Sequence, residues 1–154
     1  MTRPMTEALI DSHDAALFDL DGVVYLGSEV VPAAPATMSR LRARGVGVGF
    51  VTNNAARATT VVADQLTDMG IPAAPSDVVS SAEAVTALVA TELGQGTRVL
   101  IAATSNVDDL ARQRSLVPVH SADEHPQAVI QGYDPDIEWS RLEEAAFAVQ
   151  AGAH

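Results

Sequence analysis

Two carboxylates spaced two residues apart are the most chemically informative feature of this sequence. Asp19 and Asp21 follow the apolar run at residues 15–18, and Gly22 comes directly after them. In an extended strand, residues i and i+2 point to the same side, so we expect both acids to lie together where a strand ends. Like charges in contact repel unless a cation or a shared proton compensates them. The pair therefore predicts a nucleophile with a neighbouring acid/base, both near a metal ion.

A second polar group follows another predicted strand, at residues 46–51. It consists of Thr52, Asn53 and Asn54. Ligands of open α/β sheets bind outside the carboxyl ends of the strands, so neighbouring strands would bring this group to the same crevice as Asp19 and Asp21. Hydroxyl and amide donors beside a carboxylate nucleophile suit a phosphoryl group, whose oxygens need donors and whose phosphorus needs an attacking oxygen in line. These residues favour phosphoryl chemistry.

The elements that must position these residues alternate between strand and helix. Helical spacing and cap signals predict helices at about 34–44, 62–69, 80–93, 105–114 and 138–151, and apolar runs predict strands at 15–18, 46–51, 98–103, 117–119 and 128–131. Short strands alternating with helices imply βαβ units and a parallel sheet. The fold class is therefore predicted to be α/β.

Several local features carry sharper predictions. Ser80 and Glu83 fit a capping box, and Gly45 is expected to end the first helix. Ser105 is expected to cap a helix, with Asp108 and Asp109 in its first turn, where acids favour the helix dipole. The last helix is expected to pack through Leu142, Ala146 and Val149, with Trp139 packed beside them. Asp134 and Asp136 fit turn or cap positions. The four histidines fit surface positions: His13, His120, His125 and His154.

Composition excludes several classes of protein. The chain has 154 residues, a net charge of −11 and no cysteine, and all nine of its basic residues are arginine. The negative charge argues against nucleic acid and anionic membranes as partners, and the lack of cysteine excludes disulfides and thiolate metal sites. No apolar stretch has the length of a signal peptide core or of a membrane helix, so a cytoplasmic location is expected.

Both polar motifs resemble the haloacid dehalogenase (HAD) superfamily of phosphatases, in its NagD-like branch (subfamily IIA). The resemblance rests on the segment from Asp19 to Gly27 and on residues 50–54, and segments 77–82, 129–133 and 145–152 resemble the cap of that branch. It implies a Rossmann-like parallel-sheet half-core at residues 1–79, followed by part of an α/β cap domain at residues 80–154. Pro72–Ser80 is the expected hinge. Small phosphorylated metabolites are the implied substrates, and a homodimer through the cap fits the branch.

The resemblance also implies a role for each matching residue. Asp19 would attack the phosphorus and form an aspartyl-phosphate, and Asp21 would protonate the leaving oxygen and then activate water. Mg²⁺ would bind the Asp19 carboxylate and the backbone carbonyl of Asp21. Thr52 would hold a phosphate oxygen, and Asn53 and Asn54 would add donors. Gly22, counted with the substrate-binding residues, and Gly27 would flank a mobile turn.

The sequence departs from the family pattern in two ways. Ala56 stands where the branch often has Ser or Thr, so the loop is expected to be looser. The family's later phosphate-neutralising lysine or arginine and its acidic pair do not follow in the expected order, so we expect a piece of a protein about twice as long, weakly active or inactive by itself. The alternatives are a non-catalytic fragment or interaction module, and a receiver-like domain, which the segment at 22–25 and Thr52-Asn53-Asn54 fit poorly.

Overall fold

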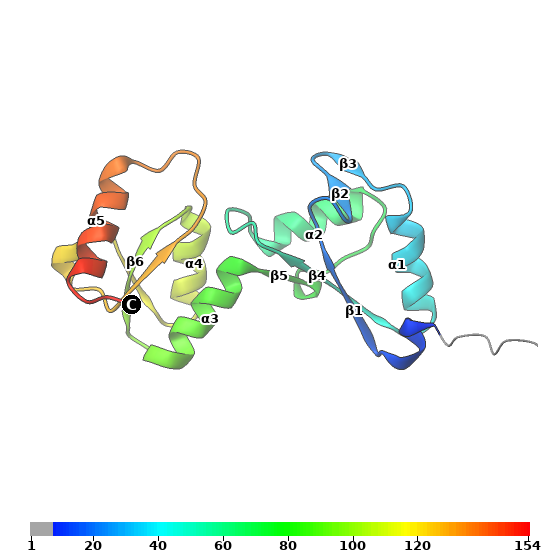
Figure 1. Cartoon of the computed structure of the whole chain (residues 1–154), viewed down its shortest axis with the longest axis horizontal. Helices are drawn as coiled ribbons and strands as arrows, with labels where there is room; N and C mark the ends of the chain where they lie inside the picture. Colours follow the sequence, from blue (N-terminus) through cyan, green and yellow to red (C-terminus); the bar gives the residue numbers. More distant parts are fainter. Residues whose placement is uncertain (1–7) are drawn as a thin grey trace, which may run out of the picture. The chain divides into compact units, whose positions relative to one another are not determined.

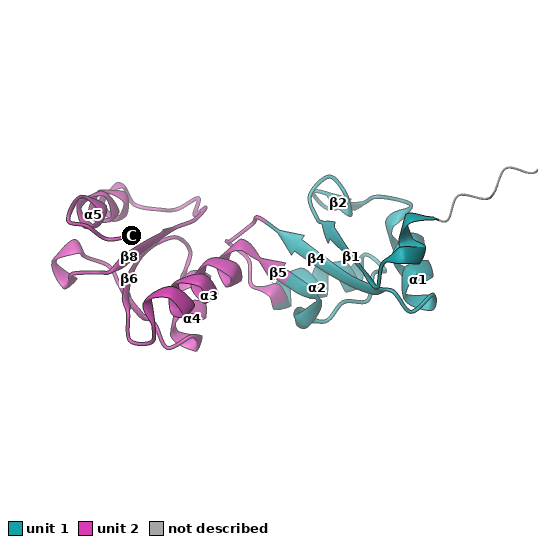
Figure 2. Cartoon of the chain, turned by 60° about the horizontal axis from the view of Figure 1, so that its bottom comes forward, with its two compact units in different colours: residues 1–52, 60–78 teal, residues 53–59, 79–154 magenta. Residues whose placement is uncertain are grey.

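The computed structural model describes residues 8–154, which form an α/β fold with parallel sheets, as predicted (Figure 1). The chain divides into two compact units: residues up to 52 together with 60–78, and residues 53–59 together with 79–154 (Figure 2). The sequence analysis predicts a single domain boundary, between residues 79 and 80. The assignment of the two parts to a HAD half-core and a partial cap stays a prediction.

The first unit is built on the strands β1 (Ala15–Asp19) and β4 (Gly47–Thr52). They pair in parallel, with Ala15 opposite Gly47 and Asp19 opposite Val51. The short strand β5 (Val78–Ser80) completes a sheet of order β1-β4-β5. It was not predicted, because the sequence analysis assigned Pro72–Ser80 to a hinge. The parallel pair brings the carboxyl ends of β1 and β4 to one edge of the sheet.

A core of large apolar side chains holds this unit together. The helices α1 (Ala34–Ala43) and α2 (Thr59–Asp68) contribute Met38 and Leu66, which pack with Phe50 of β4 and with Leu20. The strands β2 (Tyr25–Leu26) and β3 (Glu29–Val30) form an antiparallel hairpin between β1 and α1. Gly45 follows α1 with a φ of 78°, in the left-handed region, which confirms the predicted end of this helix.

The second unit has a parallel sheet of order β7-β6-β8, with helices on both faces. Its elements are α3 (Ser81–Leu93), β6 (Arg98–Ala102), α4 (Ser105–Gln113), β7 (Val117–Val119), β8 (Ala128–Gln131) and α5 (Trp139–Gln150). Val99 and Ile101 of β6 pack with residues of α3 and α4, whereas Leu100 and Ala102 pack with residues of α5. Side chains of a strand alternate between faces, so covering both faces requires the apolar run that the sequence shows here. The remaining elements are the 3₁₀ turns Leu9–Ser12, Pro75–Asp77 and Ala122–Glu124.

The predicted helix caps are right at α3 and wrong at α4. Ser80 accepts the Glu83 N–H at 3.2 Å, and Glu83 accepts the Ser80 N–H at 3.5 Å, which is the expected capping box. Ser105 is already helical, and the N-cap of α4 is Thr104, whose side chain makes no cap hydrogen bond. The Thr104 hydroxyl instead donates to the carbonyl of Ala56 at 3.5 Å.

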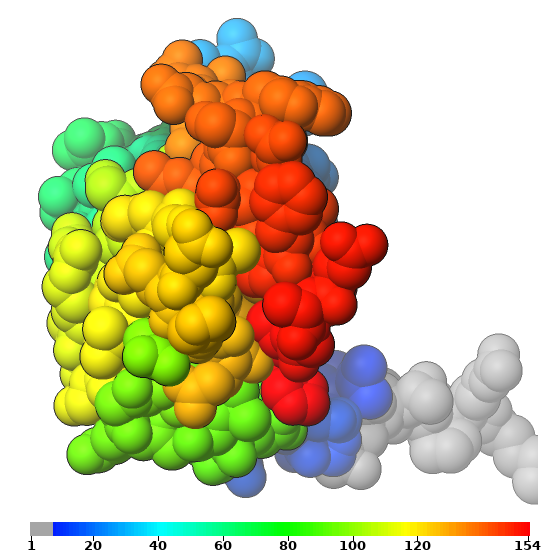
Figure 3. Space-filling model, turned by 90° about the vertical axis from the view of Figure 1, so that its left-hand side faces the viewer, coloured from blue at the N-terminus to red at the C-terminus, as the bar shows by residue number. Residues whose placement is uncertain are grey.

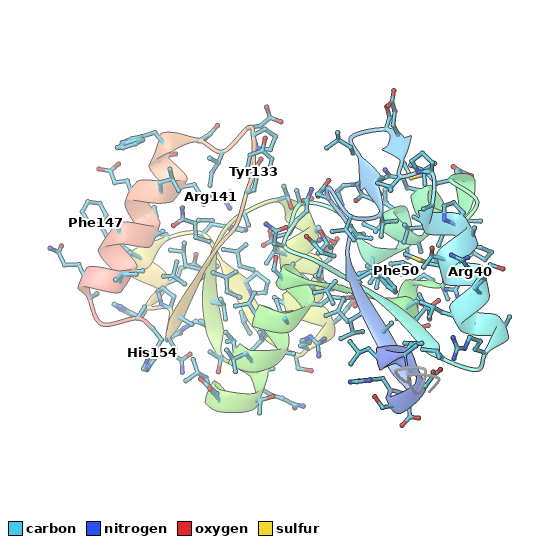
Figure 4. The ribbon with its side chains drawn as sticks, turned by 45° about the vertical axis from the view of Figure 1, so that its right-hand side comes forward. Arg40, Phe50, Tyr133, Arg141, Phe147 and His154 are labelled. Atoms are coloured by element: carbon cyan, nitrogen blue, oxygen red, sulfur yellow. The ribbon has the colours of Figure 1, made fainter. Side chains whose placement is uncertain are left out.

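The predicted packing of α5 is wrong in part. Leu142 is half-buried as expected, but Ala146 is exposed and Val149 is 54% exposed. The buried residues of this helix are Ala145 and Ala148. Trp139 does not pack against the helix and is 79% exposed, because it is the first residue of α5 and precedes the buried row. Figure 3 shows α5 at the surface of its unit, and Phe147 lies on its outer side in Figure 4.

The other surface predictions hold with one exception. All four histidines are exposed, and Asp134 Oδ1 accepts the N–H of Asp136 at 3.0 Å, which is turn chemistry. Asp108 lies in the first turn of α4 as expected, but it is buried, 3.7 Å from His120 Nε2. No helix within residues 8–154 has both the length and the apolar character needed to cross a membrane.

Candidate functional site

The predicted acid pair lies in a tight turn at the end of β1, the acid turn (residues 19–25). Asp19 is the last residue of β1, and both Asp19 and Asp21 are exposed. Between them, Leu20 is fully buried in the core. The Leu20 carbonyl accepts the N–H groups of Val24 at 2.9 Å and Tyr25 at 3.2 Å. A buried residue between two exposed acids thus fixes the turn from inside.

Gly22 closes the acid turn through its backbone. Its φ is 81°, a conformation that costs residues with a Cβ about 1–2 kcal/mol. Its N–H donates to the Tyr25 carbonyl at 2.7 Å, so this amide serves the turn. A Cβ at this position would meet no atom within 4 Å, so the requirement for glycine is one of backbone conformation and not of space.

Thr52 reaches the same edge of the sheet as Asp19. It is the last residue of β4, and the register places Asp19 opposite Val51, the residue before it. Thr52 is 3% exposed, whereas Asp19 is exposed. The parallel pairing therefore brings together three of the predicted residues, namely Asp19, Asp21 and Thr52, at the carboxyl ends of two neighbouring strands.

Asn53 and Asn54 belong to the second unit although they directly follow Thr52 in the sequence. They begin the Asn loop (residues 53–58), which has no regular secondary structure. Asn54 Oδ1 accepts the N–H of Ala56 at 3.0 Å, the local bond of an Asx turn. The loop also receives hydrogen bonds from residues of the second unit that are distant in sequence.

Three side chains of the second unit donate to carbonyls of the Asn loop. Ser81 Oγ donates to Asn53 at 3.0 Å, Asn106 Nδ2 donates to Ala55 at 3.1 Å, and Thr104 donates to Ala56. The Ala55 side chain is buried with Ala103, and a Cβ at Gly132 would lie 3.4 Å from that of Ala55. The loosening expected from Ala56 is therefore opposed by bonds from α3 and α4. Sequence reasoning missed Ser81, Thr104 and Asn106, because nothing in their spacing connects them to Asn53.

The acid turn carries the oxygen donors that suit Mg²⁺. Asp19 Oδ1 accepts the N–H of Leu20 at 2.9 Å. Residues 8–154 contain no group of three or more His, Asp or Glu side chains that could hold a metal. Magnesium usually binds proteins through one or two carboxylates and keeps waters or takes phosphate oxygens for the rest of its shell. The Asp19 carboxylate and the Asp21 carbonyl fit that pattern.

The sequence profile of haloacid dehalogenase-like hydrolases matches residues 16–116. The chain belongs to this family. The match includes both the acid turn and the Asn loop, so the resemblance drawn from these two motifs is confirmed. The chain's relatives include phosphatases of Mycobacterium tuberculosis and Staphylococcus aureus.

The similarity extends over nearly the whole chain. D-glycerol 3-phosphate phosphatase of Mycobacterium tuberculosis is 39% identical over 96% of this chain, and acid sugar phosphatase of Staphylococcus aureus is 32% identical over 92% of it. The crystal structure of glycerol phosphate phosphatase from M. tuberculosis in complex with magnesium is 40% identical and covers 94% of this chain with a TM-score of 0.87. The chain spans 41% and 53% of the lengths of the two curated relatives, and 43% of the crystallised chain.

Proposed function

We propose that this HAD protein takes part in the hydrolysis of a small phosphate monoester through an aspartyl-phosphate on Asp19. One observation carries the proposal: Asp19 and Thr52 end two parallel strands in adjacent register, with Asp21 two residues further on. Ligands of α/β sheets bind at this edge. The phosphatase relatives and the shared motifs support the same chemistry.

The chain's own residues supply both halves of the reaction. The Leu20 N–H binds Asp19 Oδ1, and Oδ2 would be the oxygen that attacks the phosphorus. A bond forms between Oδ2 and phosphorus as the bond to the leaving oxygen breaks, and Asp21 gives that oxygen a proton. Asp21 then takes a proton from water, the water oxygen attacks the phosphorus, and the bond to Asp19 breaks to release inorganic phosphate.

The remaining predicted residues would bind the phosphoryl group and a metal ion. Asp19 and the Asp21 carbonyl would hold Mg²⁺, which neutralises charge on the phosphoryl oxygens when bound. Thr52, Asn53 and Asn54 would donate to those oxygens. Gly22 would contribute through the shape of the acid turn, because its N–H donates to Tyr25.

The first substrate to test is D-glycerol 3-phosphate, because the M. tuberculosis relative with 39% identity carries that name. The test is phosphorylation of Asp19, measured by mass spectrometry after incubating the chain with Mg²⁺ and this ester or 4-nitrophenyl phosphate. This measurement does not require full turnover. We expect a phosphoryl group on Asp19 that is lost in Asp19→Asn and when a chelator removes Mg²⁺.

The outcome also decides between this proposal and a non-catalytic module. The non-catalytic module is the second candidate, because the chain spans only 41% and 53% of the lengths of the two phosphatases to which it is similar. No phosphorylation with either ester, in a chain whose circular dichroism shows it to be folded, would favour the module. Fast, continuous turnover that Asp19→Asn abolishes would instead contradict the expectation that the chain is weakly active or inactive by itself.

A further inference from the structure

The Asn loop is held from one side by hydrogen bonds to its carbonyl oxygens. The Ser81 hydroxyl donates to the Asn53 carbonyl, and the Asn106 amide donates to the Ala55 carbonyl. Ser81 is the first residue of α3, and Asn106 is the second residue of α4. The two donors are 28 and 51 residues away from their acceptors in sequence, so the bonds exist only when the second unit is folded.

These bonds fix the direction of N–H groups as well as of carbonyls. A trans peptide unit is planar, and its N–H points opposite to its C=O. Holding the Asn53 carbonyl therefore sets the direction of the Asn54 N–H, and holding the Ala55 carbonyl does the same for the Ala56 N–H. The Ala56 N–H in turn bonds to Asn54 Oδ1, which orients the Asn54 side chain. Each donated bond thus acts on Asn54, a predicted phosphate ligand.

Packing restricts the same segment. Ala55 is 9% exposed and lies in the apolar core formed by α3, β6, α4 and β8. A buried residue in the middle of a short loop leaves its neighbours little freedom, because protein interiors are close-packed. The Asn loop is therefore built as part of the second unit's core, with its two asparagines at the border of that core.

We infer that Asn106 and Ser81 are positioning residues for phosphate binding. They hold the backbone of the Asn loop so that Asn53 and Asn54 present their donors to a phosphoryl group. The inference rests on the proposed function, since it assumes that the Asn loop binds phosphate. Neither residue touches the reacting atoms, and their effect passes entirely through the loop.

The first experiment measures inorganic phosphate binding to the 154-residue chain with Mg²⁺, from the shifts of the Asn53 and Asn54 amide signals in ¹H–¹⁵N NMR spectra. Asn106→Ala and the isosteric Asn106→Asp each remove the donor to Ala55, and Ser81→Ala removes the donor to Asn53. Each variant should raise the Kd for phosphate about twofold to tenfold, the range expected for one hydrogen bond. The control is Asp109→Asn on the same helix, whose side chain is 68% exposed and pairs with Arg112; it should leave the Kd unchanged.

The second experiment needs no ligand, and it separates the anchoring of the Asn loop from the binding of phosphate. Hydrogen exchange of the Ala56 amide should become several-fold faster in Asn106→Ala and unchanged in Asp109→Asn. Unchanged exchange in both Asn106 variants would overturn the inference, as would faster exchange with an unaltered Kd for phosphate. If the unmodified chain binds no phosphate while Asn106→Ala still loosens the loop, the proposed function fails at this site and the inference falls with it, although the anchoring of the loop stands.

Discussion

The acid turn and the Asn loop follow two neighbouring strands, yet they are held in opposite ways. In the acid turn, the bonds are local: the Leu20 carbonyl accepts N–H groups three to five residues later, and Gly22 donates to Tyr25. In the Asn loop, the carbonyls are held by side chains that lie 28 to 51 residues further along the chain. The two halves of the predicted site therefore depend on different parts of the sequence.

Because they are held differently, the acid turn and the Asn loop should lose their shapes under different conditions. The acid turn should keep its shape whenever β1 and its core contacts are formed, because the hydrogen bonds of the Leu20 carbonyl and of the Gly22 N–H join residues within the turn itself. The Asn loop should keep its shape only when α3 and α4 are in place, because Ser81 and Asn106 supply its bonds. Substitutions far from the chemistry should disturb the Asn loop and leave the acid turn intact.

The largest effect is expected from Leu20→Ala in the acid turn. Leu20 is fully buried between the two acids, and removing a buried leucine side chain usually costs about 2–5 kcal/mol of the free energy of unfolding. Urea unfolding followed by circular dichroism measures this loss. The control is Leu17→Ala on the same strand, where the side chain is 74% exposed and the cost should be within about 0.5 kcal/mol. Equal costs at the two positions would mean that the acid turn is not fixed from the core.

The acid turn was also the part of the site that the sequence predicted best. Its signals are local, since an apolar strand, two acids at i and i+2 and a glycine are read within a few residues. The same holds for the Ser80–Glu83 capping box and for Gly45 at the end of α1. The alternation of strands and helices predicted a parallel sheet. The meeting of Asp19 and Thr52 at one edge was expected only if the two strands were neighbours, which β1 and β4 are.

What the sequence did not show depends on contacts between distant residues. No pattern around Asn106 indicates that its amide bonds to Ala55, and no pattern distinguishes Thr104 from Ser105 as the cap of α4. Trp139 was expected to pack because it is large and apolar, but the row of residues that α5 buries begins after it. Such outcomes are decided by tertiary packing, which overrides local preference.

An intermediate effect is expected from Gly132→Val, at a position that is distant from the Asn loop in sequence but close to Ala55 in space. A Cβ at residue 132 would lie 3.2 Å from that of Ala103 and 3.4 Å from that of Ala55, so a larger side chain must displace one of them. Overpacking of this kind typically costs about 1–3 kcal/mol. We also expect faster hydrogen exchange of the Ala56 amide, measured by NMR, with the amides of the acid turn unchanged.

Gly132→Ala is the graded control for this substitution, because a single methyl group requires shifts of only a few tenths of an ångström. Its effect on unfolding and on exchange should be smaller than that of Val and of the same sign. If Gly132→Val alters the exchange of Val24 and Tyr25 as much as that of Ala56, the two halves of the site are not held separately, and the comparison between them is wrong.

The smallest effect is expected from Thr104→Val, which ranks the bonds of the Asn loop. The Thr104 hydroxyl lies 3.5 Å from the Ala56 carbonyl, at the limit of a hydrogen bond, and makes no cap bond to α4. The isosteric valine should therefore change the free energy of unfolding by less than about 0.5 kcal/mol, and the exchange of the Ala56 amide should stay close to that of the unmodified chain. If Thr104→Val loosens the loop as much as Asn106→Ala does, the Asn loop depends on every bond it receives and not mainly on the shorter ones from Ser81 and Asn106.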